Sequence, residues 1–120
     1  MTLEECYSKL EGDYTEARNR LMNDRLIDRF ILKFPDDPSM SALKEMVAAG
    51  DNAAAFRAVH TLKGVAANLA FTRLFRDAFN LTEQLRDLKS DPDMEMYNAL
   101  NASYDLVIAT LKEYAESKNN

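Results

Sequence analysis

The only histidine of the chain, His60, lies in a segment of helical pattern together with Lys63 and Gly64. At 100° per residue, Lys63 and Gly64 fall about 60° and about 40° to either side of His60. A neutral imidazole is a nucleophile toward phosphoryl groups and titrates near neutral pH, and a lysine ammonium binds phosphate oxygens. Arg57, three residues before the histidine, can add a second positive charge. These residue types at this spacing predict phosphoryl chemistry on one helix face.

Small residues lie beside the predicted nucleophile. Gly64 occupies a mid-helix position, where glycine costs about 0.5–1 kcal/mol relative to alanine. Together with Ala67, it would leave room for the catalytic pocket of a partner to close over His60. The alternative is that Gly64 allows another helix of the same chain to cross closely.

Three aromatic residues are candidates for a docking surface. Phe56 and Phe71 fall about 40° and about 20° from His60 on the helical projection. Phe79 lies off the apolar stripe of the following helix. The alternative for Phe56 is packing against a neighbouring helix, and a wide core face would explain Phe79 equally well.

Apolar residues recur every three or four positions, which is typical of amphipathic helices. Caps and breakers divide these residues into segments over 3–10, 14–34, 39–49, 53–70, 72–88 and a last helix from about 94 to 115. This pattern predicts an all-α fold, and short loops between long helices favour antiparallel neighbours. The prediction is an antiparallel up-down four-helix bundle with one or two additional short helices, in one domain over 1–120 with a bundle core at about 13–115.

Composition excludes several classes of protein. Three glycines and three prolines among 120 residues are too few turn residues for a β-sandwich or barrel. A net charge of −5 without a basic stripe makes nucleic acid and anionic membranes poor partners. The lone Cys6 can form neither an internal disulfide nor, with one histidine, a metal or haem ligand set. The sequence shows neither a signal peptide nor a membrane span, so we expect a cytoplasmic protein.

The segment HTLKGVAANLA, residues 60–70, resembles the signature of histidine-containing phosphotransfer (HPt) domains, in which His-x-x-Lys-Gly lies on one helix of a four-helix bundle. The preceding AAGDNAAAFRAV is similar to the run-in of that family, and the resemblance covers roughly residues 10–115. It implies that His60 is the phosphoacceptor, through Nε2, that Lys63 stabilises the phosphoryl group and that Gly64 provides clearance. One departure is Ala70, where the family commonly has glycine.

The resemblance further implies a phosphocarrier without an ATP site of its own, which relays phosphoryl groups between receiver aspartates. The expected partners are response-regulator receiver domains, a hybrid sensor histidine kinase, or both, and the protein is expected to be a monomer. It would need no cofactor, since the receiver supplies Mg²⁺. Two alternatives are a phosphoacceptor module of a histidine kinase and a helical adaptor that binds receivers without phosphate. The absence of a kinase domain after residue 120 favours a free-standing carrier or an excised fragment, and the intact His60, Lys63 and Gly64 argue against the adaptor.

Overall fold

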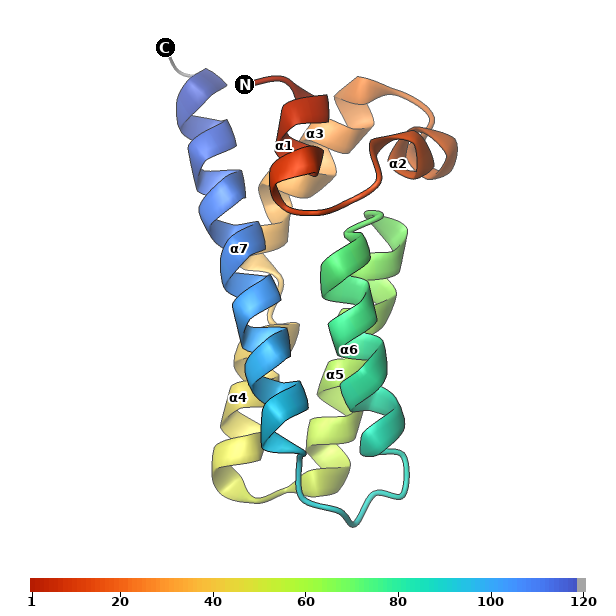
Figure 1. Cartoon of the computed structure of the whole chain (residues 1–120), viewed down its shortest axis with the longest axis vertical. Coiled ribbons are helices and arrows are strands. Elements are labelled where there is room, and N and C mark those ends of the chain that lie inside the picture. The colour runs from red at the N-terminus through yellow and green to blue at the C-terminus, as the bar shows by residue number, and fades with distance from the viewer. Residues whose placement is uncertain (119–120) are drawn as a thin grey trace.

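The structure is a computed structural model that describes residues 1–118, and within these residues it contains helices and no strand (Figure 1). Seven α-helices and one 3-10 turn follow one another along the chain: α1 (Leu3–Lys9), α2 (Tyr14–Leu21), α3 (Asp24–Lys33), η1 (Phe34–Asp36), α4 (Ser39–Ala49), α5 (Asn52–Asn68), α6 (Thr72–Gln84) and α7 (Met94–Lys118). The prediction of an all-helical protein is therefore confirmed. None of the helices in residues 1–118 is long and apolar enough to cross a membrane.

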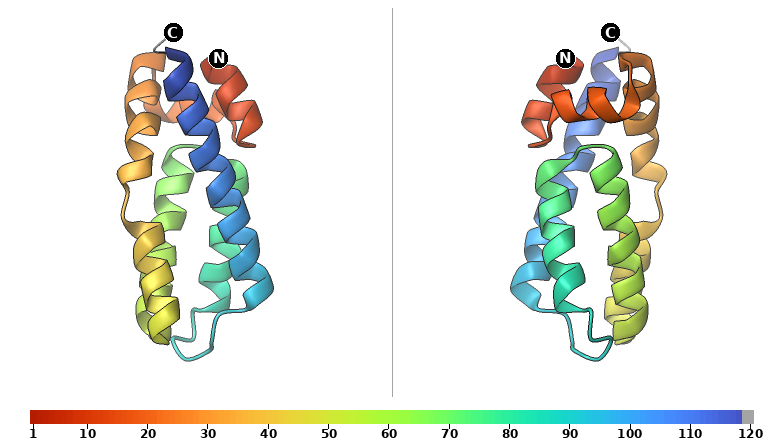
Figure 2. Two further views of the ribbon diagram at one scale, coloured as in Figure 1. Left: turned by 90° about the vertical axis from the view of Figure 1, so that its left-hand side faces the viewer. Right: turned by 90° about the vertical axis from the view of Figure 1, so that its right-hand side faces the viewer.

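Helices α4, α5, α6 and α7 form an antiparallel bundle in which successive helices run in opposite directions (Figures 1 and 2). Helix α3 continues above α4 along one side, while α7 runs nearly the full length of the molecule, which extends 46 × 27 × 20 Å. The loops at both ends of α5 are short, so α4 and α6 are held against it. The inner faces of the bundle bury one apolar core, which includes Leu43, Ala55, Val59, Leu62, Ala66, Leu74, Ala78, Leu81, Leu100, Val107 and Leu111.

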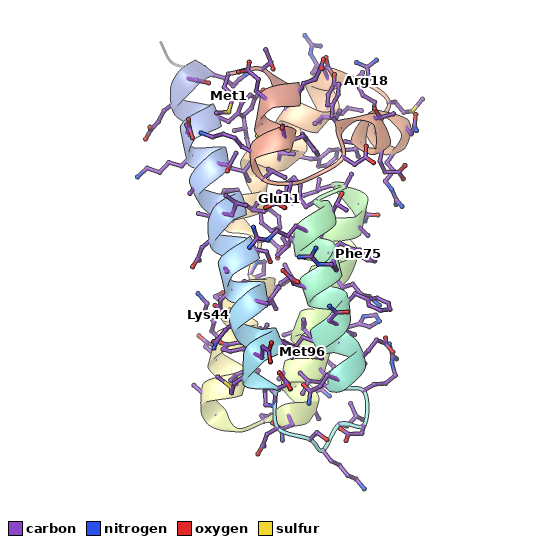
Figure 3. All side chains as sticks on the ribbon, in the orientation of Figure 1. Met1, Glu11, Arg18, Lys44, Phe75 and Met96 are labelled. Carbon is purple, nitrogen blue, oxygen red and sulfur yellow. The ribbon has the colours of Figure 1, made fainter. Side chains whose placement is uncertain are left out.

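The core reaches further toward the N-terminus than residue 13, the boundary predicted from sequence. Cys6, Tyr7 and Leu10 of the first segment are all buried. The Tyr7 hydroxyl donates a 2.8 Å hydrogen bond to the carbonyl of Leu69 in the turn between α5 and α6. The backbone N–H of Arg73 bonds to the carbonyl of Glu11, which lies where the N-terminal segment meets α6 (Figure 3). Helix α1 thus covers the end of the bundle toward which α5 points.

The starts of α1, α2 and α5 have the side-chain caps that the sequence offers there, whereas α4 and α6 begin without a side-chain cap. Thr2 and Glu5 form a reciprocal capping box before α1. The side chains of Asp13 and Asp51 accept backbone N–H groups at the starts of α2 and α5. Gly50 ends α4 in the left-handed conformation, with φ of 72°. These contacts satisfy N–H and C=O groups that have no partner inside a helix.

The prediction of a single helix over 14–34 is wrong, because the chain forms two helices there, α2 and α3, with a break between them. Met22 has φ of 74°, and the Asn23 side chain accepts the N–H of Leu26 to start a new helix. Asparagine is among the strongest N-cap residues, and here its cap takes precedence over the apolar periodicity. Within α3, Ile27 and Ile31 are buried, whereas Phe30 is 43% exposed.

The helix predicted over 72–88 is also too long, since α6 ends at Gln84. The carboxylate of Asp87 accepts backbone N–H groups from Lys89 and Ser90, which closes a turn instead of another helical turn. Leu88 then has φ of 64° and is 47% exposed, outside the core. A short acidic side chain that bonds to its own neighbouring backbone competes with helix continuation in this way.

Candidate functional site

Helix α5 presents His60 on the face opposite its buried stripe. Ala55, Val59, Leu62 and Ala66 are fully buried on the inner face, whereas His60 is exposed. Because the inner face packs against its neighbours along its length, the backbone beneath the histidine is fixed. The imidazole is therefore accessible to a partner and lies on a rigid element. At 100° per residue, His60 lies roughly opposite this stripe on a helical projection, so the exposure of the imidazole follows from the helical periodicity.

The side chain of Phe56, one turn before His60, lies close to both the histidine and a cation. The Phe56 and His60 ring centroids are 5.7 Å apart, with an interplanar angle of 44°. The guanidinium carbon of Arg86 lies 5.3 Å from the centroid of the Phe56 ring. Phe56 is half-buried, so it both supports the imidazole and contributes apolar surface next to it. The two alternatives weighed for Phe56, packing and docking surface, are thus compatible.

Lys63 leans toward the neighbouring helix α6. Its ammonium nitrogen lies 5.7 Å from the centroid of the Phe79 ring, a cation–π distance. Phe79 is 42% exposed and its ring centroid is 6.0 Å from that of Phe75, another residue of α6 (Figure 3). The α5 and α6 surfaces beside His60 therefore carry aromatic rings and positive charge together. Figure 2 shows these two helices side by side on one face of the molecule.

Gly64 is exposed, and a Cβ placed on it would meet no described atom within 4 Å. Another helix of residues 1–118 therefore does not cross closely at Gly64, which removes the packing explanation for this glycine. Ala67, one turn further on, is half-buried. Gly64 and Ala67 thus present no large side chain on the C-terminal side of His60, and this surface is open to an incoming group.

The two remaining predicted site residues, Arg57 and Phe71, differ in their exposure to solvent. Arg57 is exposed, and its guanidinium forms none of the ion pairs found within residues 1–118. Phe71 is fully buried, so its assignment to the docking surface is wrong. Its ring packs against Tyr7 and Phe34, with ring centroids 5.8 and 5.3 Å apart. The helical projection failed here because α5 ends at Asn68, three residues before Phe71.

Two charged residues of the site were missed in the sequence. Glu83, in the last turn of α6, and Arg86, just beyond the end of that helix, form an ion pair with a 2.7 Å contact. Hydrogen bonds from the Arg86 guanidinium lower the pKa of the Glu83 carboxyl, and the charges of Lys63 and His60 act in the same direction. Opposite charges three residues apart were visible in the sequence. Their position next to His60 depends on how α6 packs against α5.

Residues 1–118 contain no group of three or more His, Cys, Asp or Glu side chains placed to hold a metal ion. Cys6 is a buried residue of α1, and His60 is exposed on α5. The chemical groups at the site include the exposed imidazole of His60 and the ammonium of Lys63.

A helical bundle with an exposed histidine, a lysine three residues later and an open glycine next to it defines a phosphotransfer type of domain. The family model of the Hpt domain matches residues 3–110, and the chain belongs to this family. Hpt domains carry phosphoryl groups in two-component signalling, and their interactions are with receiver domains or kinases. The match includes α1, which the resemblance noted in the sequence had left out. No significant match was found among curated proteins or solved structures.

Proposed function

We propose that this protein is a phosphocarrier of a phosphorelay, which accepts a phosphoryl group on His60 from a receiver aspartate or a kinase and passes it to another receiver aspartate. The observation that carries this proposal is the exposed His60 on the outer face of α5, with Lys63 and the open surface of Gly64 beside it. Membership of the Hpt domain family supports it.

The transfer exchanges one bond to phosphorus for another. The lone pair of an imidazole nitrogen of His60, expected to be Nε2, forms the N–P bond. The O–P bond of the aspartyl phosphate breaks, and the receiver recovers its carboxylate. The reverse exchange with a second receiver aspartate returns His60 to its free form. Because little other covalent chemistry is required, most of the rate comes from positioning and from stabilisation of charge.

The protein's own residues position the ring and balance charge. Phe56 packs beside the imidazole. Lys63 places an ammonium one turn away, where it can attract phosphoryl oxygens, and Arg57 is proposed as an accessory cation. Gly64 and Ala67 leave room for the receiver's pocket. That pocket is proposed to supply Mg²⁺ and the acidic residues that bind it, so the carrier itself holds no cofactor.

The proposed partners are receiver domains, a hybrid sensor histidine kinase, or both. The docking surface is proposed to be the α5–α6 face around His60, with Phe56 as its apolar contact. We further propose that the protein acts as a monomer and has no kinase activity. Incubation with labelled ATP alone should then leave the protein unlabelled. A cytoplasmic location also stays a prediction.

The test is a transfer screen in which purified receivers are phosphorylated and mixed with this protein. Label should move from at least one receiver to the wild-type protein and not to His60→Gln. Asn98→Gln, at an exposed position of α7, is the control and should accept label as the wild type does. Circular dichroism should show the same helicity for all three proteins.

Two results would contradict the proposal. Transfer of label to His60→Gln would show that another residue is the acceptor. Binding of receivers without any transfer to the wild type would favour the adaptor, which keeps the bundle and the docking surface but does not carry phosphate. The screen therefore separates the two functions that the family and the surface allow.

A further inference from the structure

The Glu83–Arg86 ion pair places a carboxylate near His60, the residue proposed to carry the negatively charged phosphoryl group. Three hydrogen bonds join the Arg86 guanidinium to the Glu83 carboxylate, with distances of 2.7, 3.2 and 3.3 Å. The same guanidinium lies 5.3 Å from the centroid of the Phe56 ring, and the centroid of that ring is 5.7 Å from the centroid of the His60 ring. The ion pair is thus linked to the imidazole through a single aromatic side chain.

Glu83 also faces Lys63 of α5. It lies in the last turn of α6, one turn after Phe79, whose ring is in contact with the Lys63 ammonium. Besides His60, the cations whose charges act on the Glu83 carboxylate are Lys63 and Arg86. The Glu83 side chain is 44% exposed. Its charge opposes the attraction that these two cations exert on a phosphoryl group.

We propose that Glu83 is a competing anion of the phosphoryl site. In the free protein its carboxylate binds Arg86, and when His60 carries a phosphoryl group the carboxylate repels it and competes with it for Lys63 and Arg86. The inference rests on the proposed function, because it concerns the phosphoryl group on His60. As a consequence, the phosphohistidine is stabilised less than it would be by the cations alone. Weaker stabilisation suits a carrier that must transfer its phosphoryl group to a receiver.

A purely structural role for the ion pair predicts something different. Opposite charges three residues apart at a helix end stabilise the helix by about 0.2–0.5 kcal/mol and need have no effect on His60. The two roles are separated by a property of the phosphohistidine itself, the pKa at which it takes up a proton. A nearby carboxylate raises that pKa because it favours the form with the extra proton, and a nearby guanidinium lowers it.

The experiment uses the full chain phosphorylated chemically with phosphoramidate, whose P–N bond breaks to release ammonia as the N–P bond to the imidazole forms. The chain has one histidine, so one phosphohistidine is expected. The midpoint of its titration is followed by the ³¹P chemical shift as pH is varied at low ionic strength. Glu83→Gln should lower this midpoint and Arg86→Gln should raise it, each by about 0.2–0.7 pH units, the equivalent of an exposed charge pair.

Glu113→Gln provides the matched control. Glu113 forms an ion pair with Lys9 of the same 2.7 Å length and similar exposure, between α1 and α7. Its removal should leave the ³¹P midpoint unchanged. The proposed competition further predicts that Glu83→Gln reacts with phosphoramidate about two to five times faster than the wild type, because the donor is an anion. Both effects should shrink as salt is added.

A midpoint in Glu83→Gln equal to that of the wild type and of Glu113→Gln would overturn the inference. So would a rise of the midpoint in that variant. Because the phosphoryl group is installed chemically, this result does not depend on any receiver. The transfer screen could therefore contradict the proposed function while the titration still shows the electrostatic competition. Conversely, transfer could be observed while the titration shows no competition.

Discussion

Gly12 lies so close to Ala70 that a Cβ added to the glycine would be 2.8 Å from the Ala70 carbonyl oxygen. The same carbonyl accepts the backbone N–H of Asp13 at 2.9 Å. Ala70 itself has φ of 58°, a left-handed conformation in which glycine is more stable. The family commonly has glycine at this position, and the alanine of this chain keeps the left-handed turn. The contact joins the N-terminal segment to the end of the helix that carries His60.

Gly12→Ala is expected to lower the free energy of unfolding by about 1–3 kcal/mol, the usual cost of overpacking. The added methyl would also lie 2.9 Å from atoms of both Leu10 and Tyr7, and the Ala70 backbone cannot move without disturbing the turn. Urea denaturation followed by circular dichroism measures the change.

Gly64→Ala is the control for this substitution, since open space surrounds Gly64. It should raise stability by about 0.5–1 kcal/mol through helix propensity alone. If the two substitutions changed the free energy of unfolding by the same amount, the Gly12 contact would contribute nothing to stability.

Gly64→Leu should impair phosphoryl transfer while it leaves the fold intact. The side chain would project into solvent next to His60, where the receiver's pocket is proposed to close. A small displacement of the reacting groups can slow transfer on the order of 100-fold. Stability should rise slightly, because leucine has the higher helix propensity. Transfer rates from a phosphorylated receiver and urea denaturation are measured on the same preparation.

Ala102→Leu, at an exposed position of α7, controls for the addition of a large apolar side chain to the surface. It should transfer at the wild-type rate. If Gly64→Leu also transferred at that rate or faster, the clearance role of Gly64 would be wrong.

Stability should fall as pH rises from about 9 to about 11 because of Cys6. Burial raises the pKa of its thiol from 9.0 to about 11, so the unfolded chain loses this proton first. The stabilisation is fully present below pH 9 and is lost as pH approaches the folded-state pKa, with a slope of at most about 1.4 kcal/mol per pH unit. Burial also raises the pKa of Tyr7, which adds to the loss above pH 10.

Urea midpoints at a series of pH values test this dependence in the wild type and in Cys6→Ala. The variant should be less stable at every pH, since it leaves a small cavity, and its decline between pH 9 and 10 should be flatter. Parallel curves for the two proteins would rule out the thiol as the cause.

Local signals in the sequence predicted most of the secondary structure. Apolar periodicity placed the helices, and side-chain caps such as Asp13 and Asp51 placed several of their starts, because these contacts form between residues close in the chain. The two errors of length, at Asn23 and Asp87, arose where a short polar side chain bonds to nearby backbone and outweighs the periodicity. Both residues are recognisable as such competitors in the sequence.

The sequence by itself determined the relative placement of the proposed nucleophile His60 and of Lys63 and Gly64 beside it, because all of them lie on one helix and helical geometry fixes their relative directions. Only the tertiary structure decided what surrounds them. It brought Glu83 and Arg86 of α6 to the site, and it buried Phe71, which the projection of one helix had placed beside His60. The physical reason is that contacts between helices depend on where each helix ends and how its neighbours pack, and these are set by the whole core.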